Sequence, residues 1–311
     1  MSNVKIANRV RYRPFQDSQR RQMKTLANWN GTEMPLEEVM VPALDRAFLF
    51  GDAVYEVIRI YGGRLWRLAD HLDRLNTGLV ELKIPYSIDT VEKLLKETLT
   101  KSGELEAIAY IQITRGAAPA RRHYFPDPES VKPNCLIYIE HFDGPDKEHQ
   151  EQGTRAILVD DIRWQRNDLK VTSLLANCMA SQQAHAQGAT TAIMVDKRGI
   201  LTEASHSSVF AVRNSTLMVS PQSSTVLPGI TKRQVIELCR SAGIAMEEGR
   251  LSQTDIAAID ELIVTDTVAE IVPVVQLDGT RIGTGKPGPI VKALQAAFRQ
   301  SIDNWLAARP A

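Results

Sequence analysis

Apolar and polar positions alternate in short runs along the first half of the chain, and these runs predict strands and helices in mixed order. Residues 53–61 (AVYEVIRIY) are β-branched and aromatic, which favours a strand, and Gly62-Gly63 predicts a hairpin turn into a second strand at 64–68. Leucines at helical spacing predict a helix at 69–82. The other elements predicted in this half are a helix at 90–102, ending before Gly103, and strands at 107–114 and 134–140.

The second half continues this mixture without a strict strand–helix–strand repeat. The elements predicted there are strands at 155–163, 191–196, 200–212, 216–220 and 261–265, and helices at 172–187, at 231–242 and from about 289 onward. The strands at 191–196 and 200–212 are expected to form a hairpin through the turn 197–199. This order predicts an α+β or mixed α/β fold in two domains.

A polar segment at 142–153 (FDGPDKEHQEQG) has almost nothing to bury and is interpreted as an interdomain linker. It separates a predicted small α/β domain at 27–141 from a larger, cofactor-binding domain at 154–311. Residues 1–26 are rich in Arg and Gln and lack a sustained apolar period, so we interpret them as a basic N-terminal arm. A chain of 311 residues is long enough for two such cores.

Composition and charge exclude several classes of partner. The 37 basic residues match 37 acidic ones, so no global field favours nucleic acid or an anionic membrane. The apolar runs are too short for a membrane-spanning helix, and the N-terminus lacks the apolar region of a signal peptide. The three cysteines lie far apart among apolar neighbours, which favours reduced thiols in a cytoplasmic protein over disulfides, and no metal site is predicted.

Two charged residues in the second half are candidates for chemistry. Lys170 precedes a predicted helix, where a lysine that points into a cleft would be desolvated and nucleophilic; the alternative is a solvated surface lysine. Glu203 stands inside an apolar predicted strand and needs a partner there, for which a pyridinium nitrogen is suitable. The alternative for Glu203 is an edge-strand glutamate that faces water.

Two further segments are suited to anions. At 227–231 (LPGIT) a glycine turn opens onto a helix, where free backbone amides and the Thr231 hydroxyl suit a phosphate; the alternative is a helix capped by Thr231. Thr114-Arg115-Gly116 leads into the loop Arg121-Arg122-His123-Tyr124, whose guanidinium groups could bind a substrate carboxylate. Simple solvation is the alternative for at least one of the paired arginines.

Together these segments resemble the fold type IV aminotransferases that use pyridoxal 5′-phosphate, and within that family the D-amino-acid transaminases. The resemblance extends from about Asn28 to the C-terminal helix. It rests on the order and spacing of these motifs: FGDAVYEV (50–57), DHLDRL (70–75), TRG (114–116) followed by RRHYFP, DIRWQRNDLK (161–170), LTEASHSSVF (201–210), LPGITKR and TDTVAEIVPV.

The resemblance implies a role for each matching residue. Lys170 would form the imine with the cofactor and then carry the proton between the substrate α-carbon and the cofactor, and Glu203 would pair with the pyridine nitrogen. Leu227 would lie against the ring. The residues implied to hold the phosphate are Arg74, Ile230, Thr231 and Thr267. An alternative for Arg74 is a helix-surface residue paired with Asp70, four positions earlier.

Tyr55, Arg121 and His123 match the substrate-carboxylate site of the D-amino-acid enzymes, in which the arginine and histidine come from the neighbouring subunit of a homodimer. The arginine loop is one residue longer here, so Arg121 and Arg122 both remain candidates. His206 and Ser208 also depart from the Ser and Asn usual in those enzymes. The loop at 265–268 (TDTV) departs in turn from the glycine-containing version of the branched-chain enzymes.

The implied activity is ping-pong transamination of a D-amino acid with a 2-oxo acid such as 2-oxoglutarate or pyruvate, through a Lys170 Schiff base. Other activities on the same scaffold stay open: branched-chain L-amino-acid transaminase, (R)-amine transaminase and aminodeoxychorismate lyase. A non-catalytic protein that only binds pyridoxal phosphate is the alternative from another class.

Overall fold

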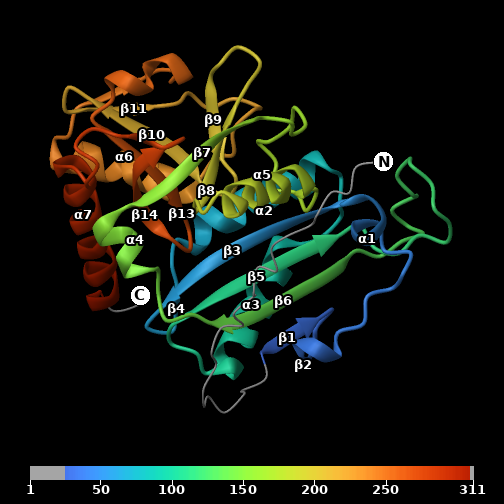
Figure 1. The fold of residues 1–311 in the computed structure, drawn as a ribbon. Coiled ribbons are helices and arrows are strands. Elements are labelled where there is room, and N and C mark those ends of the chain that lie inside the picture. Colours follow the sequence, from blue (N-terminus) through green and yellow to red (C-terminus); the bar gives the residue numbers. More distant parts are fainter. Residues whose placement is uncertain (1–24, 309–311) are drawn as a thin grey trace, which may run out of the picture.

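The computed structural model describes residues 25–308, whose strands form one sheet of six and one of nine strands with helices around them (Figure 1). This mixed α/β architecture is the predicted fold class. The arm predicted at 1–26 lies outside the described residues except for its last two positions, and Leu26 already begins a strand. No helix among residues 25–308 is long and apolar enough to cross a membrane.

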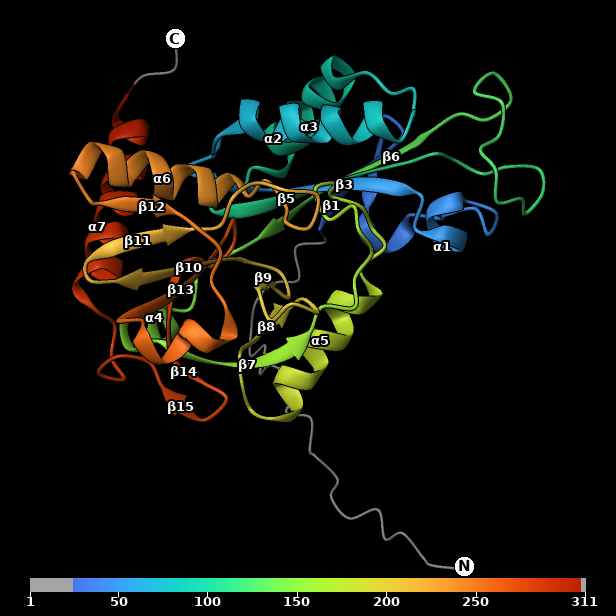
Figure 2. The same ribbon diagram turned by 90° about the horizontal axis from the view of Figure 1, so that it is seen from above.

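The first sheet is antiparallel, with strand order β2-β1-β6-β5-β3-β4. Its strands are β1 (Leu26–Trp29), β2 (Thr32–Pro35), β3 (Ala53–Tyr61), β4 (Arg64–Leu65), β5 (Ala107–Thr114) and β6 (Asn134–His141). Helices α2 (Leu68–Glu81) and α3 (Ile88–Ser102) cover one face (Figure 2). Their apolar stripes pack on β3, β5 and β6 and form a single core. The short helices η1 (Leu36–Glu38) and α1 (Arg46–Phe50) lie in the connection to β3.

The second sheet has the order β12-β11-β10-β13-β14-β7-β8-β9, with β15 paired to β14. Its strands are β7 (Thr154–Asp160), β8 (Thr191–Val195), β9 (Leu201–Ala204), β10 (Ser208–Arg213), β11 (Thr216–Val219), β12 (Met246–Glu248), β13 (Glu261–Asp266), β14 (Glu270–Leu277) and β15 (Thr280–Arg281). Helices α6 (Ile230–Ala242) and α7 (Pro289–Ala307) share a core with β10, β11 and β13. Helix α5 (Leu175–Ala186) packs on β7 and β8, and η2 (Gln253–Ala258) precedes β13.

The strand predicted at 200–212 is wrong in one respect, because it is two strands. A turn at Ser205-His206-Ser207 separates β9 from β10, and the Ala204 N–H closes it by donating to the Ser207 carbonyl (2.8 Å). After the turn, β10 pairs with β11 and β13 instead of continuing beside β8. Residues 201–210 are buried except His206, which is exposed in the turn. The polar run Ser205-His206-Ser207-Ser208 is the sequence signal for the change of direction.

Helix α4 (Lys147–Gln152) lies in the segment predicted as a linker, where the apolar pattern predicts no element. Each sheet is made only of strands from one side of that segment. We therefore propose 27–141 and 154–311 as the two domains.

Polar contacts between the two halves bring β3 and α2 against α6 and β14. The Tyr61 hydroxyl donates to the buried Glu270 carboxylate (2.9 Å). Arg67, at the start of α2, donates from both terminal nitrogens to Glu237 of α6 (2.6 and 3.0 Å). The halves consequently meet along the side of β3 that carries Tyr55.

Candidate active site

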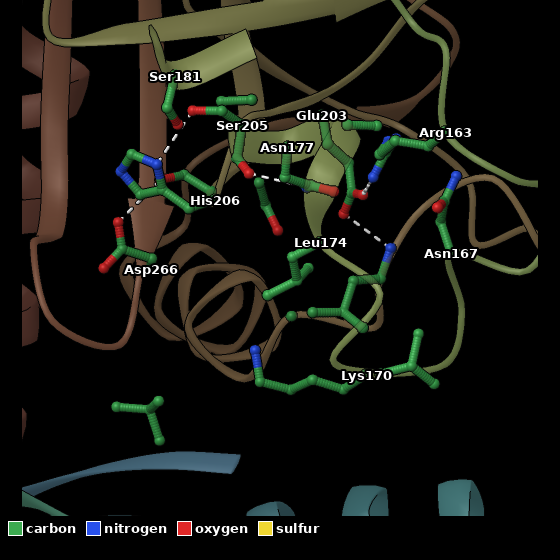
Figure 3. Close-up of a pocket in the computed structure, with 18 of the residues that line it drawn as sticks. Arg163, Asn167, Lys170, Leu174, Asn177, Ser181, Glu203, Ser205, His206 and Asp266 are labelled. Atoms are coloured by element: carbon green, nitrogen blue, oxygen red, sulfur yellow. Dashed lines mark hydrogen bonds and ion pairs between the residues drawn. The ribbon is translucent and has the colours of Figure 1, made fainter. Parts of the chain in front are cut away.

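A cavity of about 720 Å³ lies between the two halves of the chain. Its walls come from β3, α2, the loop that follows β7, one side of α5, the β9–β10 turn, the start of α6 and the end of β13 (Figure 3). It brings together all the residues predicted to hold the cofactor, namely Arg74, Lys170, Glu203, Leu227, Ile230, Thr231 and Thr267, together with Tyr55. These residues are spread over more than 200 positions of the sequence and meet only through the fold.

Lys170 lies in the loop between β7 and α5, and this loop is held against β3. Its carbonyl accepts the backbone N–H of Tyr55 (3.0 Å), and Val171 forms a bridge with Val54. The Lys170 ammonium group lies 4.2 Å from the centre of the Tyr55 ring, a cation–π distance. Lys170 therefore lines the cavity and is only partly exposed, in contrast to a freely solvated surface lysine.

Glu203 lies on β9, at the edge of the sheet, yet only 6% of it is exposed. One carboxylate oxygen accepts Nη1 of Arg163 (2.6 Å) and the other accepts the backbone N–H of Leu227 (2.7 Å). Burial raises the pKa of Glu203, while Arg163 and the Leu227 N–H act in the opposite direction. In Figure 3, Glu203 and Lys170 extend toward the same space from different sides of the cavity.

Arg163 was not singled out by the sequence, although it belongs to the DIRWQRNDLK motif. Asp161 accepts its Nε and Nη2 (3.0 and 2.8 Å), and the Thr202 hydroxyl donates to Asp161 (2.7 Å). The guanidinium is thereby fixed beside Glu203. The signal that could have found it is the buried acid itself, because a buried carboxylate requires a partner.

The N-terminus of α6 opens into the cavity. Gly229 is the N-cap residue and makes no side-chain capping bond, so the predicted alternative of a Thr231 cap is wrong. Thr231 is instead the second residue of the helix, buried in the cavity wall. The backbone amides of Ile230 and Thr231 have no partner within the helix because they belong to its first turn, and they suit an anion.

Arg74 lies beside this N-terminus. Its Nη1 donates to the carbonyl of Pro228 (2.9 Å), while Nε and Nη2 donate to the two carboxylate oxygens of Glu56 (2.7 and 2.8 Å). Asp70 pairs with Arg67 and Arg233. The alternative that Arg74 is a surface residue paired with Asp70 is therefore wrong.

Glu56 binds the guanidinium of Arg74, and His71 in turn contacts Glu56. Neither residue was predicted. Glu56 is completely buried, and the guanidinium of Arg74, together with His71, lowers its pKa against the effect of burial. His71 Nδ1 lies 2.8 Å from Glu56, and burial lowers the pKa of this imidazole. Since an ionised carboxylate can only accept, Nδ1 of His71 carries the hydrogen.

Two turns complete the wall of the cavity. The carboxylate of Asp266 accepts the backbone N–H of Val268 and Ala269 (2.8 and 2.7 Å) and the Ser207 hydroxyl (2.8 Å), which ties the turn carrying Thr267 to the β9–β10 turn. On the β9–β10 turn, Ser205 Oγ lies 3.0 Å from His206 Nδ1, and the Ser205 carbonyl accepts the Asn177 amide of α5 (2.8 Å).

Arg121, Arg122 and His123 do not line the cavity of their own chain. They lie in the loop between β5 and β6, which projects at the far end of the first sheet (Figure 2). Tyr55 does line the cavity, so the structure of one chain separates the predicted substrate-binding residues into two places.

This chain matches the family model for amino-transferase class IV over residues 53–277. It therefore belongs to the class IV aminotransferases and is a pyridoxal-phosphate-dependent transferase. It is 37% identical to a D-alanine aminotransferase of Bacillus licheniformis, over 90% of this chain and 97% of the relative. A D-alanine aminotransferase of Staphylococcus haemolyticus is 34% identical, over 88% and 97% of the two chains.

Solved structures of the same fold include branched-chain amino acid aminotransferases. That of Escherichia coli has a TM-score of 0.81 at 26% identity, covering 88% of this chain and 93% of that one. That of Thermoproteus uzoniensis has a TM-score of 0.77 at 28% identity, with the same coverages of 88% and 93%.

The cavity fits pyridoxal phosphate. Its wall contains an open helix N-terminus beside a guanidinium, which suits the phosphate, and a buried carboxylate on a different side, which suits a protonated ring nitrogen. The buried hydroxyl of Thr265, also in the wall, has no hydrogen-bond partner within residues 25–308. An oxygen-rich ligand would satisfy it.

Proposed function

We propose that this enzyme transfers the amino group of a D-amino acid to a 2-oxo acid, such as 2-oxoglutarate or pyruvate, in a ping-pong reaction. The observation that carries the proposal is the placement of Lys170 and Glu203 on different sides of one cavity whose floor is an open helix N-terminus. The choice of D-amino acids is supported by the similarity to D-alanine aminotransferases over most of the chain.

Each wall residue has a task in this proposal. Arg74 and the first turn of α6, with Thr231, bind the phosphate, and Thr267 adds a second hydroxyl. Leu227 lies against the ring, and Glu203 holds the pyridine nitrogen in its protonated form. When bound, pyridoxal phosphate supplies the electron-withdrawing ring that makes the substrate α-proton removable.

Lys170 would hold the cofactor through its side-chain amine and would move the proton at the substrate α-carbon. The Tyr55 ring, whose centre lies 4.2 Å from Nζ of Lys170, packs beside the amine and orients it in the cavity. The hydrogen bond from the Tyr55 N–H to the Lys170 carbonyl fixes the Lys170 loop against β3. This limits the directions from which the amine reaches the substrate.

The proposal includes a homodimer whose partner subunit supplies the substrate-carboxylate residues. Arg121 and His123 do not reach the cavity of their own chain, which is consistent with action in the other subunit. Large apolar side chains are exposed on α1, on this loop and on α5: Phe48, Tyr124 and Leu175. Apolar exposure of this kind is typical of an interface.

We also propose the cytoplasm as the location of the enzyme. Cys135, Cys178 and Cys239 are all free thiols, as is usual in a reducing compartment.

Borohydride reduction followed by digestion and mass spectrometry tests the covalent attachment. We expect the label on Lys170, and we expect Lys170→Ala to lose both steady-state transamination and the absorbance band of the protonated imine. Lys292→Ala, on the exposed side of α7, is the control and should retain both. A label on another lysine, or on none, would overturn the assignment.

A substrate panel tests the choice of amino acid. D-Alanine with 2-oxoglutarate should yield pyruvate, whereas a branched-chain enzyme, favoured by the solved structures of the same fold, would convert L-leucine to 4-methyl-2-oxopentanoate. Conversion of (R)-amines, pyruvate formed from aminodeoxychorismate without an acceptor, or binding without conversion to the pyridoxamine form would each select a different alternative.

A further inference from the structure

Helix α1 (Arg46–Phe50) is held rigidly between the first sheet and the loop that carries Arg121 and His123. Its N-cap residue, Asp45, is completely buried and accepts the hydroxyl of Thr114 and the amide of Asn134 (2.8 and 2.7 Å). Its C-terminus turns at Gly51, whose φ of 67° favours glycine. Both neighbours of the loop, β5 and β6, are therefore tied to the start of this helix.

The side chain of Arg46 contacts the backbone of this loop. The residue is only 3% exposed, and its Nε donates to Asp52 (2.7 Å). Its Nη1 and Nη2 donate to the carbonyls of Arg122 and His123 (2.6 and 3.3 Å). One planar guanidinium therefore determines the path of two successive peptide groups in the loop.

Phe50, at the other end of α1, contacts the functional side chains themselves. The guanidinium of Arg121 lies 4.9 Å from the centre of the Phe50 ring. The ring of His123 lies 5.5 Å from the same ring at an angle of 48°. The two side chains proposed to bind the substrate carboxylate thus share one aromatic support.

We propose that Arg46 and Phe50 are positioning residues, which shape the loop so that Arg121 and His123 bind the substrate carboxylate in the partner subunit. The inference rests on the proposed function, because it takes the carboxylate site and its sharing between subunits from there. Neither residue touches the substrate, and both act on the cavity of the other chain.

Arg59 provides a matched control for Arg46. It is equally buried, with 2% exposed, and it too binds two backbone carbonyls, those of Ile60 and Ala107 (2.9 and 2.7 Å), and a carboxylate, Glu106 (2.9 Å). It lies at the opposite end of β3 from the loop. Both substitutions remove a buried guanidinium, but only the change at Arg46 removes hydrogen bonds to the loop that carries Arg121 and His123.

The first experiment compares steady-state kinetics of Arg46→Met and Arg59→Met, both loaded with cofactor. For Arg46→Met we expect the KM of D-alanine and of 2-oxoglutarate to rise roughly tenfold or more, since charge-assisted hydrogen bonds are lost, with kcat changed by less than about threefold. Its preference for D-alanine over D-alaninamide, which has no carboxylate, should fall by the same factor. Arg59→Met should keep the KM values and the preference of the wild type.

Phe50→Leu gives an independent reading, because it removes the aromatic support and leaves the backbone contacts of Arg46. We expect the same direction of change in KM and in the preference for the carboxylate. If Arg46→Met does not fold, as judged by thermal unfolding and cofactor absorbance, Phe50→Leu decides the question.

The second experiment tests action across the subunits. Dimers that combine one Arg46→Met subunit with one Lys170→Ala subunit contain a single competent site, formed by Lys170 of the first and the intact loop of the second. We expect such mixed dimers to have the KM of the wild type and about half its activity per dimer. The homodimer of either variant lacks such a site.

Several results would overturn the inference: unchanged KM values in both Arg46→Met and Phe50→Leu, an equal loss in Arg59→Met, a monomeric enzyme, or mixed dimers with the raised KM of Arg46→Met. Failure of the proposed function is seen separately, as a wild-type enzyme that converts L- but not D-amino acids. The same measurements with L-leucine and its amide then decide the role of Arg46 and Phe50.

Discussion

Glu56→Gln removes the charge that holds Arg74 in place. The native carboxylate, completely buried, accepts three hydrogen bonds: Nε and Nη2 of Arg74 and Nδ1 of His71, at 2.7, 2.8 and 2.8 Å. A glutamine amide has the same shape but only one oxygen. Its NH2 group would face a donor of Arg74, and the guanidinium would lose its carboxylate partner.

The expected loss of stability follows from these contacts. Removing one partner of a buried ion pair costs about 3 to 5 kcal/mol. The amide oxygen of Gln retains one bond to Arg74, and the neutral imidazole of His71 can change tautomer to accept from the amide. We therefore expect the lower end, about 3 kcal/mol, for the free energy of unfolding of the apoprotein.

The sign of the pH effect follows from the lowered pKa of Glu56. Because this pKa is lower in the folded than in the unfolded protein, the stabilisation is fully present above the ordinary pKa of 4.5 and is lost as the pH falls toward the folded value. Burial also lowers the pKa of His71, so protonation of the imidazole adds to the loss below about its ordinary value of 6.5. Glu56→Gln should remove the carboxylate contribution and flatten the acid side of the stability profile.

Urea unfolding of the apoprotein at several pH values measures both effects. A double-mutant cycle with Arg74→Met separates the pair from unrelated damage, and we expect Glu56→Gln to cost much less in the Arg74→Met background. Additive effects of the two substitutions, a loss below about 1 kcal/mol for Glu56→Gln, or an unchanged acid side of the profile would refute the reasoning.

Two further substitutions test the cofactor cavity. Arg163→Met removes the counter-ion of Glu203, so burial raises the pKa of Glu203 further; we expect the acid side of the kcat profile to move to higher pH and kcat at neutral pH to fall roughly tenfold or more. An unshifted profile would contradict this role. Thr231→Val keeps the shape of the side chain but removes a hydroxyl beside the open end of α6. We expect the dissociation constant of pyridoxal phosphate to rise about tenfold in titrations of the apoprotein, and equal affinity would place the phosphate elsewhere.

Much of the fold could be predicted from local pattern. Strands β3 and β5 have the predicted bounds, because a run of β-branched and aromatic residues indicates its own ends when a turn follows. Helices α2, α3 and α6 begin and end within two residues of prediction, since their apolar stripes repeat at 3.6 residues and α3 and α6 end at a glycine with positive φ. Other elements have no such pattern: β14 was not predicted, and the turn at 205–207 interrupts a buried run at His206 alone.

The residues of the site likewise fall into those that the sequence indicated and those that only the structure revealed. Glu203 stood out as a carboxylate inside an apolar strand, whereas Lys170 and the 227–231 segment were selected because the order of the motifs along the chain resembles one family. The sequence by itself therefore determined the family, its cofactor and the residues proposed to hold it.

Only the tertiary structure decided how these groups are held and charged. Glu203 faces Arg163, and Arg74 faces Glu56. Arg46 binds the loop of His123 from 77 positions away in the sequence. A buried charge requires an opposite charge or a dipole at about 3 Å, but the chain can supply that partner from any element. Hydrophobic pattern indicates which face of an element is buried, and the packing of the elements selects the partner that meets it.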